Sequence, residues 1–395
     1  IPRNFTLPME VIEGIIKPVV SKPGIVQAKF TEIRGEKMNK KITTLFAVLM
    51  IFSMTLSACG SAEEPTPEAV ITEAPTAEAP TIGSAEHPIK VLFVPSVDAN
   101  EIVAGGELLA QTLNEATGLT FEVIVPTSYA ATIEEMCASP ADTMGFIPGL
   151  GYVLANQVCG VEVAAKAVRY GYDWYAAMVV VRRDSGLTEL SQLNGLRWAY
   201  PDAASTSGYL YPQYMYQENS VVPGEIIEAG SHDAALMAVY NGEADFGTAF
   251  YSPARVDGNS VDWLPGQDPD VPADLIESCV TTEDGKALMC GNFEIRDARR
   301  NLRSTVPDAG QVLSILATTP MIPNDTISFG PEFPAEIRDL IITALFDFAT
   351  NDPEGFAAAM APYSWTGINA ATDADYDPIR NAIQASGFTL EDLGE

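Results

Sequence analysis

The stretch that decides the fold is LRWAYPDAASTSGYLYP, residues 196–212. It begins as an apolar run that ends at Tyr200, turns at Pro201 and Asp202, and passes through hydroxyl residues into a helical pattern that ends near Asn219. A strand, a turn and a helix in this order form half of a βαβ unit. The stretch therefore predicts an α/β fold with a helix N-terminus at the end of a strand.

Three hydroxyl residues and a glycine stand in a row at this helix start: Ser205, Thr206, Ser207 and Gly208. Capping the helix needs only one of them, and simple capping is the alternative interpretation. Helix N-termini also bind oxyanions through unpaired N–H groups without a full cation, and glycine lets a ligand approach the backbone. The turn lacks the Gly/Lys pattern of a P-loop and the Gly-x-Ser-x-Gly of a nucleophile elbow. It therefore predicts an oxyanion-binding turn.

The same alternation of strands and helices extends in both directions along the chain. IKVLFVP, LTFEVIVP and DTMGFI predict strands separated by amphipathic helices, and a second series follows YAAMVVVRR. Such a pattern indicates parallel sheets with right-handed crossovers. We predict one lobe from residues 88–180 and 320–395 and a second from residues 181–319. Hinge strands near residues 178–182 and 321–329 join the lobes, with a ligand cleft between them.

The cysteines indicate an oxidising compartment. Cys137, Cys159, Cys279 and Cys290 form an even set, for which three pairings exist and the nearest-neighbour pairing is favoured. No CxxC spacing and only two histidines are present, so a zinc site is disfavoured and no metal is expected. The second pair lies in an insertion at about residues 252–300, which we interpret as a long loop stapled by a disulfide.

The N-terminal region predicts export. Residues 38–58 combine two lysines with an apolar run and resemble a signal peptide, which places residues 1–37 upstream of the true start. The run is short for a membrane span. Leu-Ser-Ala-Cys resembles a bacterial lipobox, with Cys59 as the lipidated residue of a protein held on the outer face of the cell membrane. Residues 59–87, rich in Pro, Glu, Ala and Thr, predict an extended stalk.

The charge excludes one class of partner. The net charge is −31, from 53 acidic and 22 basic side chains, whereas nucleic-acid binding needs a basic footprint. The one basic run, Arg296, Arg299, Arg300 and Arg303, has helical spacing; a solvated helix face is the favoured interpretation and a partner contact the alternative.

Three further side chains are candidates for ligand contact. Ser231 can cap a helix in AGSHDAALMAVYNG, and a neutral His232 in its first turn can donate one hydrogen bond to a ligand oxygen. From the spacing alone, an exposed first-turn histidine is an alternative of equal weight. Tyr129 precedes the helix ATIEEMCAS, and Tyr175 opens the strand YAAMVVVR. Taken alone, ordinary half-buried packing is the favoured interpretation of both tyrosines.

Together these motifs resemble a known family. YAATIEE, residues 175–212, AGSHDAALMAVYNGEADFG and LATTPMIPNDTISF are similar, in order, to the phosphate, phosphite and phosphonate-binding proteins of ABC importers. The resemblance implies a type II periplasmic-binding-protein fold that closes on a small oxyanion and delivers it to a membrane permease. It also implies a monomer without a cofactor, and no catalytic step.

The resemblance assigns roles to this chain's residues. It places the phosphonyl oxygens on Ser205, Thr206, Ser207 and Gly208, with ligand contacts from Tyr129, Tyr175 and His232. Where aminophosphonate binders carry an acidic residue, this chain has Phe250, Tyr251 and Ser252. A ligand bearing an ammonium group is therefore not expected, and Tyr175, Phe250 and Tyr251 are expected near the ligand's substituent.

Two other functions remain open from the sequence. The first is a sensor of the same fold that binds another small anion and presents it to a membrane receptor. The second is an enzyme on this fold, which needs a general base in the cleft. Only His232 qualifies as such a base, and no carboxylate is placed by sequence to orient it.

Overall fold

The computed structural model describes residues 81–261 and 263–393. The predicted signal peptide, Cys59 and most of the predicted stalk lie outside the described residues. The stalk was predicted to reach residue 87, but the chain already packs against the first lobe from Gly83, whose carbonyl accepts the N–H of Thr120 at 2.8 Å. His87 Nε2 lies 2.8 Å from Asp142 Oδ2. The composition of residues 59–87 did not predict that this short turn packs against the lobe.

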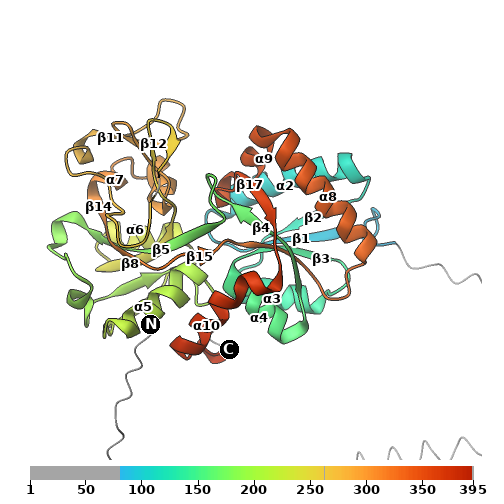
Figure 1. Cartoon of the computed structure of the whole chain (residues 1–395), viewed down its shortest axis with the longest axis horizontal. Helices are drawn as coiled ribbons and strands as arrows, with labels where there is room; N and C mark the ends of the chain where they lie inside the picture. Colours follow the sequence, from blue (N-terminus) through green and yellow to red (C-terminus); the bar gives the residue numbers. More distant parts are fainter. Residues whose placement is uncertain (1–80, 262, 394–395) are drawn as a thin grey trace, which may run out of the picture. The chain divides into compact units, whose positions relative to one another are not determined.

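The first lobe is built on a six-stranded sheet in the order β17-β4-β16-β3-β1-β2 (Figure 1). Its strands are β1 (Ile89–Phe93), β2 (Phe121–Ile124), β3 (Thr143–Ile147), β4 (Glu162–Val168), β16 (Thr326–Phe329) and β17 (Gly367–Ala370). The predicted parallel pairing holds for β1 with β2 and β3. β16 returns from the second lobe and runs antiparallel to β3 and β4, so the sheet is mixed.

Half of the helices of this lobe begin at a side-chain cap. Its helices are α2 (Ala99–Thr117), α3 (Tyr129–Ala138), α4 (Gly149–Cys159), α8 (Ala335–Asn351), α9 (Pro353–Ala359) and α10 (Asp377–Ser386). Ser128 caps α3 by accepting the N–H of Ala131. α4 was not predicted because it is buried along its first two turns and shows no polar face.

The second lobe has a sheet in the order β14-β5-β8-β6-β7, with β15 paired to the start of β5. Its strands are β5 (Trp174–Arg182), β6 (Trp198–Tyr200), β7 (Ile226–Glu228), β8 (Phe246–Tyr251), β14 (Leu313–Thr318) and β15 (Ile322–Pro323), and its helices are α5 (Tyr211–Glu218), α6 (His232–Tyr240) and α7 (Ala309–Val312). β5 pairs with β8 and β14 along nearly its whole length. The chain therefore crosses between the sheets at residues 169–173, earlier than the predicted boundary at residue 180.

The insertion is a small sheet rather than the predicted loop. Its strands pair in the order β10-β9-β13-β12-β11 and are β9 (Arg255–Val256), β10 (Asn259–Ser260), β11 (Cys279–Thr281), β12 (Leu288–Cys290) and β13 (Phe293–Ile295). Strands of two or three residues are too short to show a periodic pattern. The disulfide Cys279–Cys290 joins directly opposed residues of β11 and β12.

Both predicted disulfides are confirmed. Cys137 at the end of α3 pairs with Cys159 at the end of α4, and Cys279 pairs with Cys290. The first staples two helices of the first lobe, and the second staples the insertion. Within residues 81–261 and 263–393, no helix is long and apolar enough to cross a membrane.

Candidate functional site

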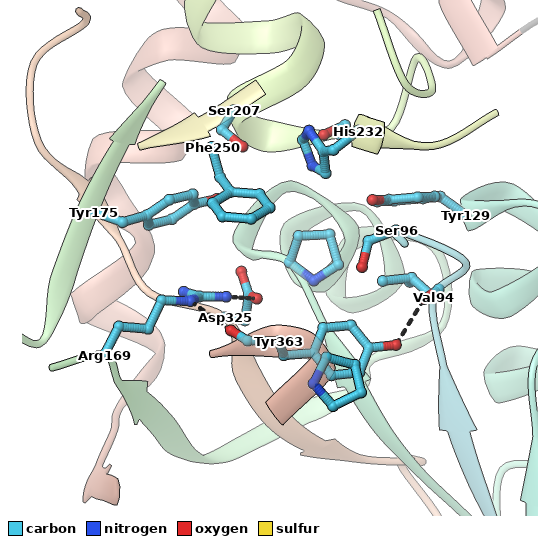
Figure 2. A pocket seen from close by; sticks show the side chains of 13 residues that line it. Val94, Ser96, Tyr129, Arg169, Tyr175, Ser207, His232, Phe250, Asp325 and Tyr363 are labelled. Atoms are coloured by element: carbon cyan, nitrogen blue, oxygen red, sulfur yellow. Dashed lines mark hydrogen bonds and ion pairs between the residues drawn. The ribbon is translucent and has the colours of Figure 1, made fainter. Parts of the chain in front are cut away.

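A small cavity lies between residues of the two lobes (Figure 2). It is lined by Val94, Ser96, Tyr129, Pro148, Arg169, Tyr175, Ser205, Ser207, His232, Phe250, Asp325, Pro362 and Tyr363. The volume that the centre of a water molecule can occupy in this cavity is about 30 Å³. A single water molecule needs about 10–15 Å³ of such volume. The space thus suits a compact group of a few heavy atoms.

The hydroxyl turn supplies two of the residues that line the cavity. Ser205 Oγ accepts the N–H of Gly208 at 3.0 Å and so caps the turn Thr206–Leu210, which leads into α5. Ser205 and Ser207 are 1% and 2% exposed, and both line the cavity. Capping and cavity lining, considered as alternatives from the sequence, therefore coexist at Ser205.

Thr206 does not line the cavity, although it was predicted to hold the ligand. Its Oγ1 accepts the N–H of Leu150 at 2.8 Å, in the first turn of α4. Asp202, from the same motif, accepts the N–H of Tyr129 at 3.2 Å, in the first turn of α3. Because these helix N-termini belong to the first lobe, the motif also holds the two lobes together.

Gly208 is likewise absent from the cavity wall. A Cβ at this position would lie 2.1 Å from Cγ and 2.4 Å from Cδ of Pro201. The tight packing of the turn on Pro201 requires a glycine at this position. The predicted role, in which Gly208 lets a ligand approach the backbone, does not fit, because Gly208 does not line the cavity.

Phe250 and Tyr251 separate to opposite faces of β8. Phe250 lines the cavity, with its ring centroid 5.2 Å from that of His232. Tyr251 packs on the other side, 4.8 Å from the Trp263 ring, and does not line the cavity as predicted. Neighbouring residues of a strand point to opposite faces, so only one of the two could face the ligand.

His232 presents an imidazole with unused hydrogen-bonding capacity. Ser231 caps α6 as predicted, and the backbone N–H of His232 donates to the Ser96 carbonyl at 3.0 Å, across the two lobes. The side chain is 4% exposed and lines the cavity, while its Nδ1 has no hydrogen-bond partner. Burial, and then the Arg169 charge, lower the pKa of His232 to about 3, so the ring is neutral.

The cavity wall contains a buried ion pair that no sequence motif predicted. Arg169 and Asp325 form an ion pair and both line the cavity (Figure 2). Arg169 Nη1 also donates to Asn324 Oδ1 at 2.6 Å, and Nε donates to the Tyr363 carbonyl at 3.0 Å. The pair joins the two crossover segments between the lobes. Because its members lie far apart in sequence, no local motif could reveal it.

Both predicted tyrosines reach the cavity. Tyr129 and Tyr175 line it and are 2% and 3% exposed. Burial raises the pKa of both hydroxyl groups above their ordinary values, which keeps them protonated as hydrogen-bond donors. The Arg169 guanidinium carbon lies 4.9 Å from the centroid of the Tyr175 ring, a cation–π arrangement.

The family is decided by comparison along most of the chain. The model of the family described as "ABC transporter, phosphonate, periplasmic substrate-binding protein" matches residues 91–376. The chain belongs to this family. It is therefore an extracytoplasmic substrate-binding protein of the phosphonate type of ABC transporter and not an enzyme, as predicted.

Individual relatives agree with the family and the fold. The chain is 28% identical over 251 residues to the "Phosphate-import protein PhnD" of Mycolicibacterium smegmatis, covering 58% of this chain and 72% of that protein. Two solved structures confirm the type II fold: an ABC phosphonate-transporter binding protein of Pseudomonas aeruginosa and PhnD1 of Prochlorococcus marinus, in complex with methylphosphonate. The first has a TM-score of 0.58 at 17% identity, covering 78% and 92% of the two chains. The second has a TM-score of 0.56 at 16% identity, covering 75% and 97%.

Proposed function

We propose that this family member binds a phosphorus oxyanion, namely phosphate, phosphite or a small phosphonate, in the interlobe cavity and delivers it to a membrane permease. The observation that carries the proposal is the donor set around the cavity. Ser205, Ser207, Tyr129 and Tyr175 contribute hydroxyls, and His232 contributes an unpartnered neutral imidazole. Multiple directed donors in a water-excluding cavity suit an oxyanion, because each hydrogen bond to a charged acceptor is strong there.

Arg169 changes the expected electrostatics of the site. The sequence suggested that dipoles alone hold the anion, whereas Arg169 brings a guanidinium into the wall. Asp325 compensates this charge, so the cavity wall carries no unpaired ion at Arg169. Because the Asp325 carboxylate is already paired with Arg169, it is not available to pair with an ammonium group. This pairing supports a ligand that carries no ammonium group.

The cavity size narrows the ligand class. The cavity volume that the centre of a water molecule can occupy is about 30 Å³. Pockets for drug-sized ligands are far larger, at roughly 300–1,000 Å³. A tetrahedral oxyanion with a hydrogen, hydroxyl or methyl substituent is the best match, and Phe250 is the apolar side chain available to pack against that substituent.

The anchoring part of the proposal rests on the sequence. The lipobox-like Leu-Ser-Ala-Cys ending at Cys59 supports a lipid-anchored protein on the outer face of the membrane. Mass spectrometry of the membrane fraction tests this point: an acylated N-terminal Cys59 is expected, and a Cys59→Ala variant should be released from the membrane.

Calorimetry with phosphate, phosphite, methylphosphonate and 2-aminoethylphosphonate tests ligand binding. One of the first three should bind in the micromolar range or tighter, and the ammonium-bearing compound should bind more weakly. Ser207→Ala removes a donor to the anion and should weaken binding about 10- to 150-fold, from about 1.5–3 kcal/mol for a hydrogen bond to a charged group. Tyr251→Phe removes a hydroxyl outside the cavity and is the matched control. Equal effects of the two variants, or no binding of any of these anions, would reject the proposal.

A further inference from the structure

A second cavity lies next to the first and is lined by two unusual arginines. It has a volume of about 390 Å³ and takes in Arg300, Arg303 and Glu101. Pro362 lines both cavities, so they share a wall. Arg300 and Arg303 come from the 3₁₀ helix Ala298–Ser304 of the second lobe, and Glu101 comes from α2 of the first.

Arg300 and Arg303 differ from the other described arginines because neither contacts a carboxylate. Every other arginine in residues 81–261 and 263–393 forms an ion pair with a carboxylate. Arg300 Nη1 instead donates to Tyr170 Oη at 2.9 Å and Ser364 Oγ at 2.7 Å. Arg303 donates to the carbonyls of Gly285 and Arg300 at 2.8 and 2.7 Å. Their bonds thus leave both positive charges without a contacting anion.

The two charges also act on each other. Burial and then the neighbouring Arg300 charge lower the pKa of Arg303, while Glu101 and Asp233 raise it without forming an ion pair. An anion placed between the arginines would relieve this repulsion. In a protein of net charge −31, such a local positive site is what an incoming anion needs in order to approach the cleft.

We propose that Arg300 and Arg303 form an anion-capturing vestibule, which holds a phosphorus oxyanion transiently beside the buried cavity before the lobes close on it. The inference rests on the proposed function for the identity of the anion. It replaces the interpretation of Arg300 and Arg303 as part of a solvated helix face. That interpretation was also wrong for Arg299, which is fully buried and paired with Asp270 and Asp297. A weak outer site of this kind raises the association rate and leaves the dissociation rate of the closed complex unchanged.

Stopped-flow measurements with inorganic phosphate test the vestibule. At low ionic strength, Arg303→Gln should slow association about two- to fourfold, the Coulomb effect of one charge on a di-anion at about 10 Å in water. Glu101→Gln removes the acidic lining residue and should speed association by a similar factor. Both effects should vanish in about 0.5 M salt. Arg338→Gln, an arginine on α8 paired with Glu162, changes the net charge equally and is the control.

A second readout separates this inference from the proposed function. In NMR spectra of the protein, the Arg303 Nε–H signal should shift saturably with millimolar phosphate, and the shift should persist in Ser207→Ala. If phosphate, phosphite and methylphosphonate all fail to bind the buried cavity but phosphate shifts Arg303, the proposed function falls and the outer anion site stands. If Arg303 does not shift, or if Arg303→Gln and Arg338→Gln slow association equally, the vestibule is refuted.

Discussion

Thr206→Val tests whether the hydroxyl motif closes the two lobes as well as lining the cavity. Valine has nearly the shape of threonine but cannot accept the Leu150 N–H, which Thr206 Oγ1 accepts at 2.8 Å. Thr206 is fully buried, so no water can replace the hydroxyl in the closed form. Separation of the lobes would expose the same N–H to water. The substitution therefore penalises closure specifically.

The size of the effect follows from the unpaired donor. A buried N–H without a partner costs about 1–3 kcal/mol, which lowers the closed-to-open ratio, and with it the ligand affinity, by about 5- to 150-fold. The loss should come from faster dissociation, because opening releases the ligand, while association changes little. Stopped-flow dissociation with the ligand identified by calorimetry measures this, and Thr206→Ser should restore slow release.

A matched control distinguishes closure from general destabilisation. Thr143 is also fully buried, and its Oγ1 donates to the Ser139 carbonyl at 2.9 Å within the first lobe. Thr143→Val should lower thermal stability and leave the dissociation rate unchanged. If Thr206→Val releases ligand no faster than Thr143→Val, the assignment of Thr206 to lobe closure is refuted.

Three further predictions concern stability. Burial raises the pKa of Asp233 to about 7, so the folded protein takes up a proton that the unfolded chain lacks, and its stability should fall as pH rises from about 4 to about 7. In Asp233→Asn this fall in stability should shrink by about 3–4 kcal/mol, and an unchanged pH profile would contradict the cause. Replacing Cys279 and Cys290 with alanine should cost about 2–3 kcal/mol of unfolding free energy without changing affinity, since neither lines the cavity; a loss of binding would contradict this. Gly208→Ala should lower stability by about 1–3 kcal/mol through its clash with Pro201, and a loss of affinity at unchanged stability would instead favour a ligand role.

Features carried by local sequence could be predicted. The strand, turn and capped helix around Ser205 follow from residue preferences at neighbouring positions, and the structure has them. The caps at Ser128 and Ser231 and both disulfide pairings depend on the same kind of local signal or on short separations. Fold and family were accessible for this reason.

Features that depend on contacts between distant segments could not be predicted. Arg169 meets Asp325 only after the chain has crossed twice between the sheets. Thr206 faces α4, a helix without a polar face, and so its partner Leu150 was invisible in the sequence. Tyr251 shows a different limit: the alternation of β8 was recognisable, but which face meets the cavity is set by the packing of the sheet.

The most direct test of the central claim is a crystal structure of the protein with phosphate or methylphosphonate. The proposal predicts one tetrahedral anion in the cavity, with its oxygens within hydrogen-bonding distance of Ser205 or Ser207 Oγ and of the His232 ring, and with Thr206 Oγ1 still bonded to Leu150 N. An anion bound only outside this cavity, or a cavity that stays free of anion in crystals of a protein saturated by calorimetry, would contradict it.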